Sequence, residues 1–200
     1  MAEASDSPAV HWVDPDERGV IPLNPPVVPA RLARTVKSTP FAIKPDTVFR
    51  DVMLACAEPA EGRENTWINQ EILDAYCRLH ERGHAHSIEV WHENRLAGGL
   101  YGVRIGAAFF GESMFSRIRD ASKIAMVHLI ARLRRGGFTL LDAQFVTPHL
   151  RQFGATAISR AQYHMRLRRA LTGSANFYEF GPAGAAVSGL AVLQETTQTS

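Results

Sequence analysis

The sequence predicts a mixed α/β domain in which helices flank one twisted sheet. Two observations predict this class. Apolar residues recur at helical spacing in several separate segments, and three strand-like runs follow one another in the middle of the chain. The chain has 200 residues, of which 46% are hydrophobic and 21% charged, so it carries enough apolar material to form a core.

Four segments have the apolar spacing of an amphipathic helix. They run from about Asp46 to Cys56, Gln70 to Arg82, Lys123 to Arg134 and Ser159 to Leu171. Residues able to cap a first turn stand at several of the starts, namely Asp46 or Thr47, Asn69, and Asp120 or Ser122. Glycines able to end a helix in the left-handed conformation follow at Gly83 and at Gly136–Gly137.

Three strand-like runs lie between the second and third helices, at Ser87–His92, Leu96–Arg104 and Ala107–Phe115. Because only short polar breaks separate them, we expect an antiparallel meander. A further strand is expected from Phe138 to Val146. By contrast, residues 1–30 are rich in proline and the C-terminal end is rich in small and polar residues, so both should be mostly irregular.

The composition says more about where the protein is located in the cell than about what it binds. A formal net charge of +2 neither indicates nor excludes a nucleic-acid partner. No apolar run reaches the roughly 20 residues that span a bilayer, and the first residues lack the plan of a signal peptide. Cys56 and Cys77 lie inside apolar helical patterns, which is typical of buried, reduced thiols. We therefore expect a soluble, cytoplasmic protein.

An acidic residue stands inside an apolar strand at the end of the meander. Burying the Glu112 carboxylate without partners is costly, so this residue either lines a functional cleft or forms a structural ion pair with Arg117 or Arg119. The neighbouring Ser113 lacks the G-x-S-x-G context of a nucleophile elbow, which argues against nucleophilic catalysis by this serine.

Two polar side chains share one side of the last predicted strand. Asp142 and Gln144 are two residues apart, so strand geometry points them the same way among apolar neighbours. They can orient a substrate amine or carbonyl, or they can form a structural network. The residues alone leave both interpretations open.

Three basic clusters could contact phosphates or form solvated surface. They are Arg31, Arg34 and Lys37; Arg132, Arg134 and Arg135; and Arg166, Arg168 and Arg169. His84 and His86 hint at a metal, but no further histidine or cysteine completes a ligand set at convincing spacing, so no metal is expected.

Several short motifs, in order along the chain, resemble the leucyl/phenylalanyl-tRNA–protein transferases. They are TWIN at 66–69, GHAHSIE at 83–89, GGLYGV at 98–103, GESMFSR at 111–117, DASK at 120–123 and DAQ at 142–144. The resemblance covers roughly residues 10 to 171. Because separate motifs occur in register, the resemblance is far more specific than one short motif would be.

The resemblance implies an acetyltransferase-like (GNAT-like) twisted mixed sheet and three regions. Residues 1–25 would be the remnant of a truncated N-terminal domain, residues 26–183 the aminoacyl-transferase domain, and residues 184–200 a loosely ordered tail. The implied activity moves leucine or phenylalanine, with methionine as a further donor residue, from aminoacyl-tRNA to proteins that begin with Arg or Lys, which marks them for N-degron degradation. The implied partners are leucyl-tRNA, phenylalanyl-tRNA and these acceptor proteins, with no metal, no cofactor, no acyl-CoA and no membrane.

The resemblance also implies roles for individual residues. A hydrophobic pocket for the donor side chain falls on Leu100, Phe109, Met114, Met126, Leu129 and Leu141, which are all apolar here. Trp67 corresponds to a tryptophan associated with the terminal adenosine, which an aromatic face can stack against. Arg34 and Lys37 correspond to tRNA-contacting positions, and Thr147 stands where some relatives have asparagine. For every pocket position, plain core packing is the alternative.

The implied reaction is ester aminolysis, with Glu112, Asp142 and Gln144 at the positions of the family's polar active-site residues. In our hypothesis Gln144 orients the attacking amine through its carbonyl, Asp142 polarises or fixes Gln144, and Glu112 shapes the charge around the acceptor N-terminus. The proton acceptor is left open between Asp142, water and the donor. Two other functions compete: a tRNA-binding module without transferase activity because of the N-terminal truncation, and an acyl-CoA-dependent N-acetyltransferase, which lacks support from a glycine-rich pyrophosphate loop.

Overall fold

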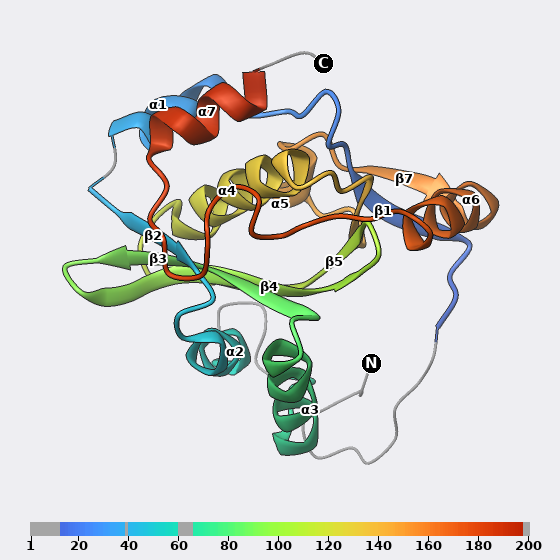
Figure 1. Ribbon diagram of the computed structural model, residues 1–200, viewed down its shortest axis with the longest axis horizontal. Coiled ribbons are helices and arrows are strands. Elements are labelled where there is room, and N and C mark those ends of the chain that lie inside the picture. Colours follow the sequence, from blue (N-terminus) through green and yellow to red (C-terminus); the bar gives the residue numbers. More distant parts are fainter. Residues whose placement is uncertain (1–12, 39, 60–65, 198–200) are drawn as a thin grey trace.

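One mixed sheet organises the chain, as the sequence predicts. The computed structural model describes residues 13–38, 40–59 and 66–197. Within them, seven strands form a sheet in the order β2-β3-β4-β5-β6-β1-β7 (Figure 1), and every neighbouring pair is antiparallel except β5 with β6. The strands are β1 (Glu17–Ile21), β2 (Ala42–Pro45), β3 (Ala85–His92), β4 (Arg95–Ile105), β5 (Ala108–Ser116), β6 (Leu140–Gln144) and β7 (Thr156–Ser159).

Helices cover both faces of the sheet. They are α1 (Ala30–Ser38), α2 (Phe49–Ala57), α3 (Gln70–Glu81), α4 (Ala121–Arg135), α5 (Pro148–Arg151), α6 (Arg160–Leu171) and α7 (Gly189–Thr197). Helix α4 packs on one face, with α1 and α7 beyond it, while α2, α3 and α6 pack on the other (Figure 1). No described helix combines the length and apolar character needed to cross a membrane.

The locally encoded elements agree with the sequence. The meander β3–β4–β5 is antiparallel, as predicted. At the start of α3 the side chain of Asn69 accepts a hydrogen bond from the Ile72 N–H at 2.9 Å, and Gly83 follows the helix with a φ of 73°. Ser159 and Gln162 form a capping box at the start of α6. These signals are local, which is why periodicity and caps are enough to find them.

Two predicted helix caps are wrong. Helix α2 begins at Phe49 without a side-chain cap, because Asp46 bonds His86 and Ser87 while the Thr47 N–H donates to Glu89. Asp120 does stand at the start of α4, but its side chain makes no capping bond. It pairs instead with Lys123 at 2.9 Å and with Arg31 at 3.1 Å.

The chain is more ordered at both ends than the sequence predicts. Residues 17–21 lie in the proline-rich stretch expected to be irregular, yet they form β1 between β6 and β7. Residues 189–197 lie in the expected loose tail, yet they form α7, which buries Val192 and Thr196 against the rest of the protein. Both segments are ordered by contacts with residues far away in the sequence, and local sequence patterns do not indicate such contacts. Part of the expected N-terminal remnant, residues 1–12, lies outside the described residues.

The predicted strand at 138–146 is shorter in the structure. Strand β6 covers Leu140–Gln144 and ends where Gln144 adopts a φ of 63°, in the left-handed region. Helix α1, strand β2, the short helix α5 and strand β7 are further elements that the sequence patterns did not indicate.

The parallel pair β5–β6 separates after the first third of β5. The two strands pair from Ala108 with Leu140 to Phe110 with Asp142, and the rest of β5 continues along β4 alone. A gap at the carboxyl ends of two parallel strands is a common place for a ligand site. The fold therefore points to this edge of β5.

A β-bulge lies at the same place. Tyr101 of β4 pairs with Ser113 and Gly102 pairs with Gly111, so Glu112 is the extra residue without a partner on β4. Phe109 and Met114 consequently pack on the same face of the sheet, although a regular strand would send them to opposite faces. Every side chain that follows the bulge on β5 therefore points to the opposite face of the sheet from the one it would have in a regular strand.

Candidate functional site

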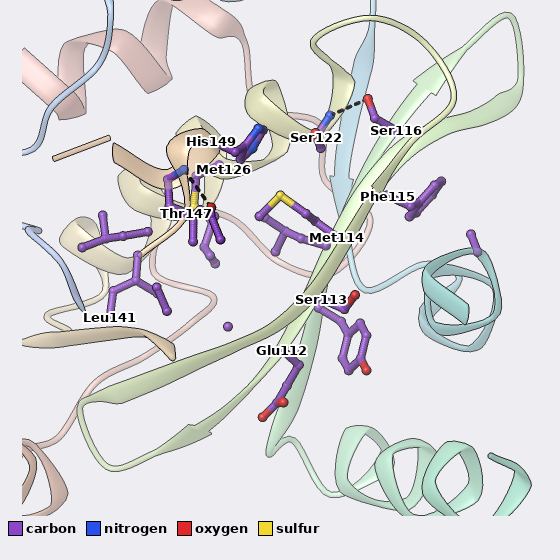
Figure 2. A pocket seen from close by; sticks show the side chains of 18 of the residues that line it. Glu112, Ser113, Met114, Phe115, Ser116, Ser122, Met126, Leu141, Thr147 and His149 are labelled. Atoms are coloured by element: carbon purple, nitrogen blue, oxygen red, sulfur yellow. Dashed lines mark hydrogen bonds between the residues drawn. The ribbon is translucent and has the colours of Figure 1, made fainter. Parts of the chain in front are cut away.

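A cavity of about 600 Å³ fills the gap between β5 and β6. Its walls come from β4, β5, β6 and α4 and from the start of α5, and Figure 2 shows Met114 of β5 and Met126 of α4 pointing toward one another across it. Apolar side chains make up most of the lining, and Glu112 and Asp142 are among its polar residues. A volume of this size is typical of small-molecule sites.

Five of the six predicted pocket residues line this cavity. They are Leu100, Met114, Met126, Leu129 and Leu141. The sixth, Phe109, does not line it. Its fully buried ring stacks on Phe177 with centroids 5.9 Å apart, so core packing is the better interpretation for this position.

Glu112 stands at the cavity wall without the arginine partner that the structural alternative requires. Arg117 instead pairs with Glu58 at 2.5 Å. The Glu112 carboxylate accepts a hydrogen bond from Gln144 Nε2 at 3.1 Å and another from the Tyr76 hydroxyl. Burial raises the pKa of Glu112 above its ordinary value, and the bonds from Gln144 and Tyr76 oppose that rise.

Asp142 is fully buried and surrounded by donors. Its Oδ1 accepts from Arg18 Nε at 3.0 Å and from the Gln144 N–H at 2.7 Å. Its Oδ2 accepts from an Arg18 Nη atom at 3.0 Å and from the Tyr163 hydroxyl at 2.5 Å. Since both oxygens are engaged by protein groups, Asp142 is poorly placed to take a proton from a substrate.

Gln144 links the two carboxylates. Its backbone N–H bonds Asp142, and its side-chain Nε2 bonds both Glu112 and the carbonyl of Gly111, the latter at 3.3 Å. These bonds use the donors of Gln144 and leave its side-chain carbonyl to accept from a substrate N–H. The structure thus brings the three predicted polar residues together in one hydrogen-bonded chain.

Arg18 and Tyr163 belong to the site although no sequence pattern indicated them. They come from β1 and α6, and the Arg18 guanidinium lies over the Tyr163 ring, 5.6 Å from its centroid. Burial, followed by the bond to Asp142, raises the pKa of the Tyr163 hydroxyl, which remains a donor at neutral pH. No spacing in the sequence connects either residue to Asp142.

His149 and Thr147 were likewise not assigned to the cavity. Thr147 caps the short helix α5 by accepting from the Leu150 N–H at 3.3 Å, and both residues line the cavity. The His149 Nε2 is buried and bonds no group of the described residues. Burial, and then the charge of Lys123, lower the pKa of His149, so its imidazole is neutral at neutral pH.

The predicted nucleic-acid contacts lie outside the cavity. Trp67 packs edge-on against Tyr76, with centroids 6.3 Å apart, and so stands one residue away from Glu112. Arg34 and Lys37 are exposed on α1. The structure contains no tRNA, so these three roles stay predictions.

Two residues of the second basic cluster, Arg132 and Arg134, bond backbone carbonyls, whereas Arg135 is exposed. Arg132 is buried and donates to the carbonyls of Phe177 and Gly181, both at 2.8 Å. Arg134 donates to the carbonyls of Leu23 and Glu195. Both residues tie irregular segments and α7 to α4. The third cluster, on α6, is exposed.

The histidines of the GHAHSIE segment have structural surroundings. His86 is buried, its Nδ1 forms a hydrogen bond with the Asp46 carboxylate at 2.8 Å, and its ring stacks on Phe177. Within residues 13–38, 40–59 and 66–197, no group of three or more His, Cys, Asp or Glu side chains could hold a metal ion. Cys56 is buried and Cys77 half-buried, and neither forms a disulfide.

Comparison with known proteins gives one consistent result. A family model described as leucyl/phenylalanyl-tRNA protein transferase matches residues 20–168. A protein of that name from Phenylobacterium zucineum is 57% identical over 202 residues, which cover 100% of this chain and 91% of the relative. One from Nitrobacter winogradskyi is 59% identical over 177 residues, which cover 88% of this chain and 79% of the relative. One from Rhodopseudomonas palustris is 56% identical, with 88% and 77% covered.

Proposed function

We propose that this chain, which belongs to the leucyl/phenylalanyl-tRNA protein transferase family, moves leucine or phenylalanine from aminoacyl-tRNA to the N-terminus of acceptor proteins. One observation carries the proposal beyond the family's name. An apolar cavity large enough for either side chain lies beside the hydrogen-bonded residues Glu112, Gln144 and Asp142. The cavity suits the donor side chain, and the polar residues suit an attacking amine.

The donor side chain enters between β5 and α4, where Met114 and Met126 face each other. Unbranched thioether side chains repack easily, so the same cavity can accept a branched aliphatic and an aromatic guest. Leu129 and Leu141 complete its wall on α4 and β6. This arrangement leaves the aminoacyl ester near the start of the polar chain at Glu112.

The reaction needs positioning and proton transfer more than activation, since the ester bond to tRNA is already reactive. In our mechanism the Gln144 carbonyl accepts a hydrogen bond from the acceptor's α-amine and directs its nitrogen toward the ester carbon. Glu112 takes one proton from that amine as the N–C bond forms. It then returns the proton to the ribose oxygen as the ester C–O bond breaks.

Glu112 suits this role better than Asp142. Burial raises the pKa of Glu112 and so makes its carboxylate a stronger base, and Glu112 lines the cavity, as Asp142 also does. The Asp142 oxygens are engaged by Arg18, Tyr163 and the Gln144 N–H. We therefore assign proton removal to Glu112. Asp142 instead holds Gln144 in position.

The finer features of the activity extend this proposal. We propose acceptors that begin with Arg or Lys, methionine as a further donor residue, and a role in N-degron degradation in the cytoplasm. The reaction requires no metal and no cofactor. A tRNA-binding module without transferase activity is the alternative function.

A panel of donors and acceptors tests the proposal. Labelled leucine on tRNA is offered with peptides that begin with Arg, Lys or Ala, and phenylalanyl-tRNA, methionyl-tRNA and acetyl-CoA are offered in parallel. We expect transfer of leucine and phenylalanine to the Arg and Lys peptides and none from acetyl-CoA. Binding of tRNA without any transfer would favour the binding module.

Narrowing the cavity should change donor choice. In Met126→Phe the added bulk enters the cavity from α4, so kcat/KM should fall roughly 10-fold more for phenylalanyl-tRNA than for leucyl-tRNA. Steady-state transfer with both donors measures this ratio. Met165→Phe, at an exposed position on α6, is the matched control and should leave the ratio unchanged. An equal effect of Met126→Phe on both donors would contradict a shared side-chain cavity.

Removing charge from α1 should weaken tRNA binding in a salt-dependent way. Arg34 and Lys37 are exposed on one helix, so replacing both with alanine should lower the slope of log Kd against log salt by about 1 to 2, since each phosphate contact contributes roughly 0.7 to 0.9. Filter binding at several salt concentrations measures the slope. Arg95→Ala, at the exposed start of β4, controls for the loss of a surface charge elsewhere on the protein. An unchanged slope in the double variant would remove α1 from the tRNA surface.

A further inference from the structure

We propose that Arg18 and Tyr163 are positioning residues of the transfer reaction, which hold Asp142 so that Gln144 keeps the backbone conformation in which its side chain meets Glu112. This inference rests on the proposed function and goes beyond it, because both residues stand outside the cavity. They act through Asp142 and Gln144, and they do not touch the substrate.

The geometry of Asp142 is set entirely by its partners. Arg18 reaches both carboxylate oxygens, with its Nε at 3.0 and 3.1 Å and an Nη atom at 3.0 Å. Tyr163 adds a bond of 2.5 Å to Oδ2. The guanidinium fork and the phenol approach from different elements, so together they fix the position and the rotation of the carboxylate.

The fixed carboxylate in turn holds an unusual backbone. Gln144 has a φ of 63°, a conformation that is unfavourable for a residue with a β-carbon. Its N–H donates to Asp142 Oδ1 at 2.7 Å, and this bond offsets part of the unfavourable conformation. If Asp142 could rotate, Gln144 would be free to continue the extended strand, and its side chain would leave Glu112.

Arg18 and Tyr163 reach Asp142 from strand β1 and helix α6. Strand β1 lies next to β6, where Val20 pairs with Asp142, and α6 packs over both strands. Arg18 also packs on the ring of Tyr163, so each residue supports the other. Strand β1 and helix α6 thereby become part of the machinery that places Gln144.

A purely structural ion pair makes a different prediction. If Arg18 and Tyr163 only satisfy a buried charge, their loss lowers stability and affects transfer in the same proportion whether or not Gln144 is present. If they position Gln144, their effect on transfer depends on the Gln144 side chain. A double-mutant cycle separates the two cases.

The experiment measures steady-state transfer of leucine to an Arg peptide over a range of leucyl-tRNA concentrations. Tyr163→Phe is made in the wild-type chain and in Gln144→Ala. We expect Tyr163→Phe to lower kcat roughly 10-fold in the wild type, as the loss of one hydrogen bond to a charged group allows, and to have no further effect in Gln144→Ala. The KM for leucyl-tRNA should stay the same.

Tyr178→Phe is the matched control, since the Tyr178 hydroxyl also donates to a buried carboxylate, Asp46 at 2.7 Å, outside the cavity. It should lower stability in a denaturant titration without lowering kcat. If Tyr163→Phe fails to fold, Arg18→Lys serves the same cycle, because it keeps the charge and loses the bidentate fork.

The outcomes are distinct. An equal loss of kcat in both backgrounds, or an equal loss in Tyr178→Phe, overturns the positioning role and leaves the proposed function intact. A wild-type chain that binds leucyl-tRNA but transfers no leucine overturns the proposed function, and this inference with it. Loss that disappears in Gln144→Ala supports both.

Discussion

Replacing Glu112 with glutamine should lower kcat for leucine transfer by about 100-fold or more, the usual contribution of a general base. The amide keeps an oxygen for the Gln144 Nε2 bond, so the change removes the base and leaves the geometry nearly intact. Transfer by the wild type should rise with pH as Glu112 ionises, and the variant should lose this rise. Pre-steady-state transfer at several pH values measures both effects.

Glu81→Gln is the control for this variant, because it changes the net charge equally at an exposed position on α3.

Stability should move in the opposite direction to activity. Since burial raises the pKa of Glu112, its stabilising contribution is present at low pH and is lost as pH rises through that pKa. The variant should therefore gain free energy of unfolding relative to the wild type toward neutral pH. A variant that transfers as fast as the wild type would show that Glu112 is not the base.

Asp142→Asn should cost both stability and activity. The change leaves the Arg18 guanidinium without its partner, and breaking a buried pair of this kind typically costs about 3 kcal/mol. The freed Gln144 should relax and lower transfer. A urea titration measures the first effect, and transfer assays in the stable temperature range measure the second.

Asp74→Asn offers the comparison, because Asp74 forms an exposed pair with Arg50 at 3.3 Å on the surface of α3. Its loss should change stability little. If Asp142→Asn were as stable and as active as the wild type, neither the ion pair nor the positioning of Gln144 would matter to this protein.

Helices and strands could be predicted from the sequence wherever the pattern that specifies them lies within a few residues. The meander was readable from three runs of β-formers, and α3 from Asn69 and Gly83, because each of these signals acts within a few residues. Strand β1 could not be predicted from the sequence. Its partners are Gln144 and Asp142 on one side and residues 156–159 on the other, all more than a hundred positions away.

The candidate site shows the same division. The period of a strand was enough to place Asp142 and Gln144 near each other, and the family resemblance picked out Glu112. The bulge at Glu112 was not readable, because it depends on which residue of β4 stands opposite. Arg18 lies 124 positions from Asp142, so only the folded sheet shows that the two meet. Phe109 was assigned to the cavity by resemblance, and its packing on Phe177 corrects that assignment.

Two arginines of α4, one buried and one half-buried, also have roles that the sequence did not indicate. Arg132 and Arg134 look like surface charge at a helix end, yet they donate to backbone carbonyls of the C-terminal segments. Those segments leave carbonyls without partners in regular structure, and a long side chain with several donors satisfies them. Sequence alone cannot show this, because the carbonyls belong to residues more than forty positions away.

The most direct test of the proposed function is the transfer of labelled leucine from leucyl-tRNA to a peptide that begins with Arg, by the wild-type chain and by Gln144→Ala side by side. We expect rapid transfer by the wild type and a loss of about 100-fold in Gln144→Ala, with tRNA binding unchanged, because the amine is no longer oriented. Equal transfer by both proteins would show that the hydrogen-bonded chain at the edge of β5 is not where the amine is placed.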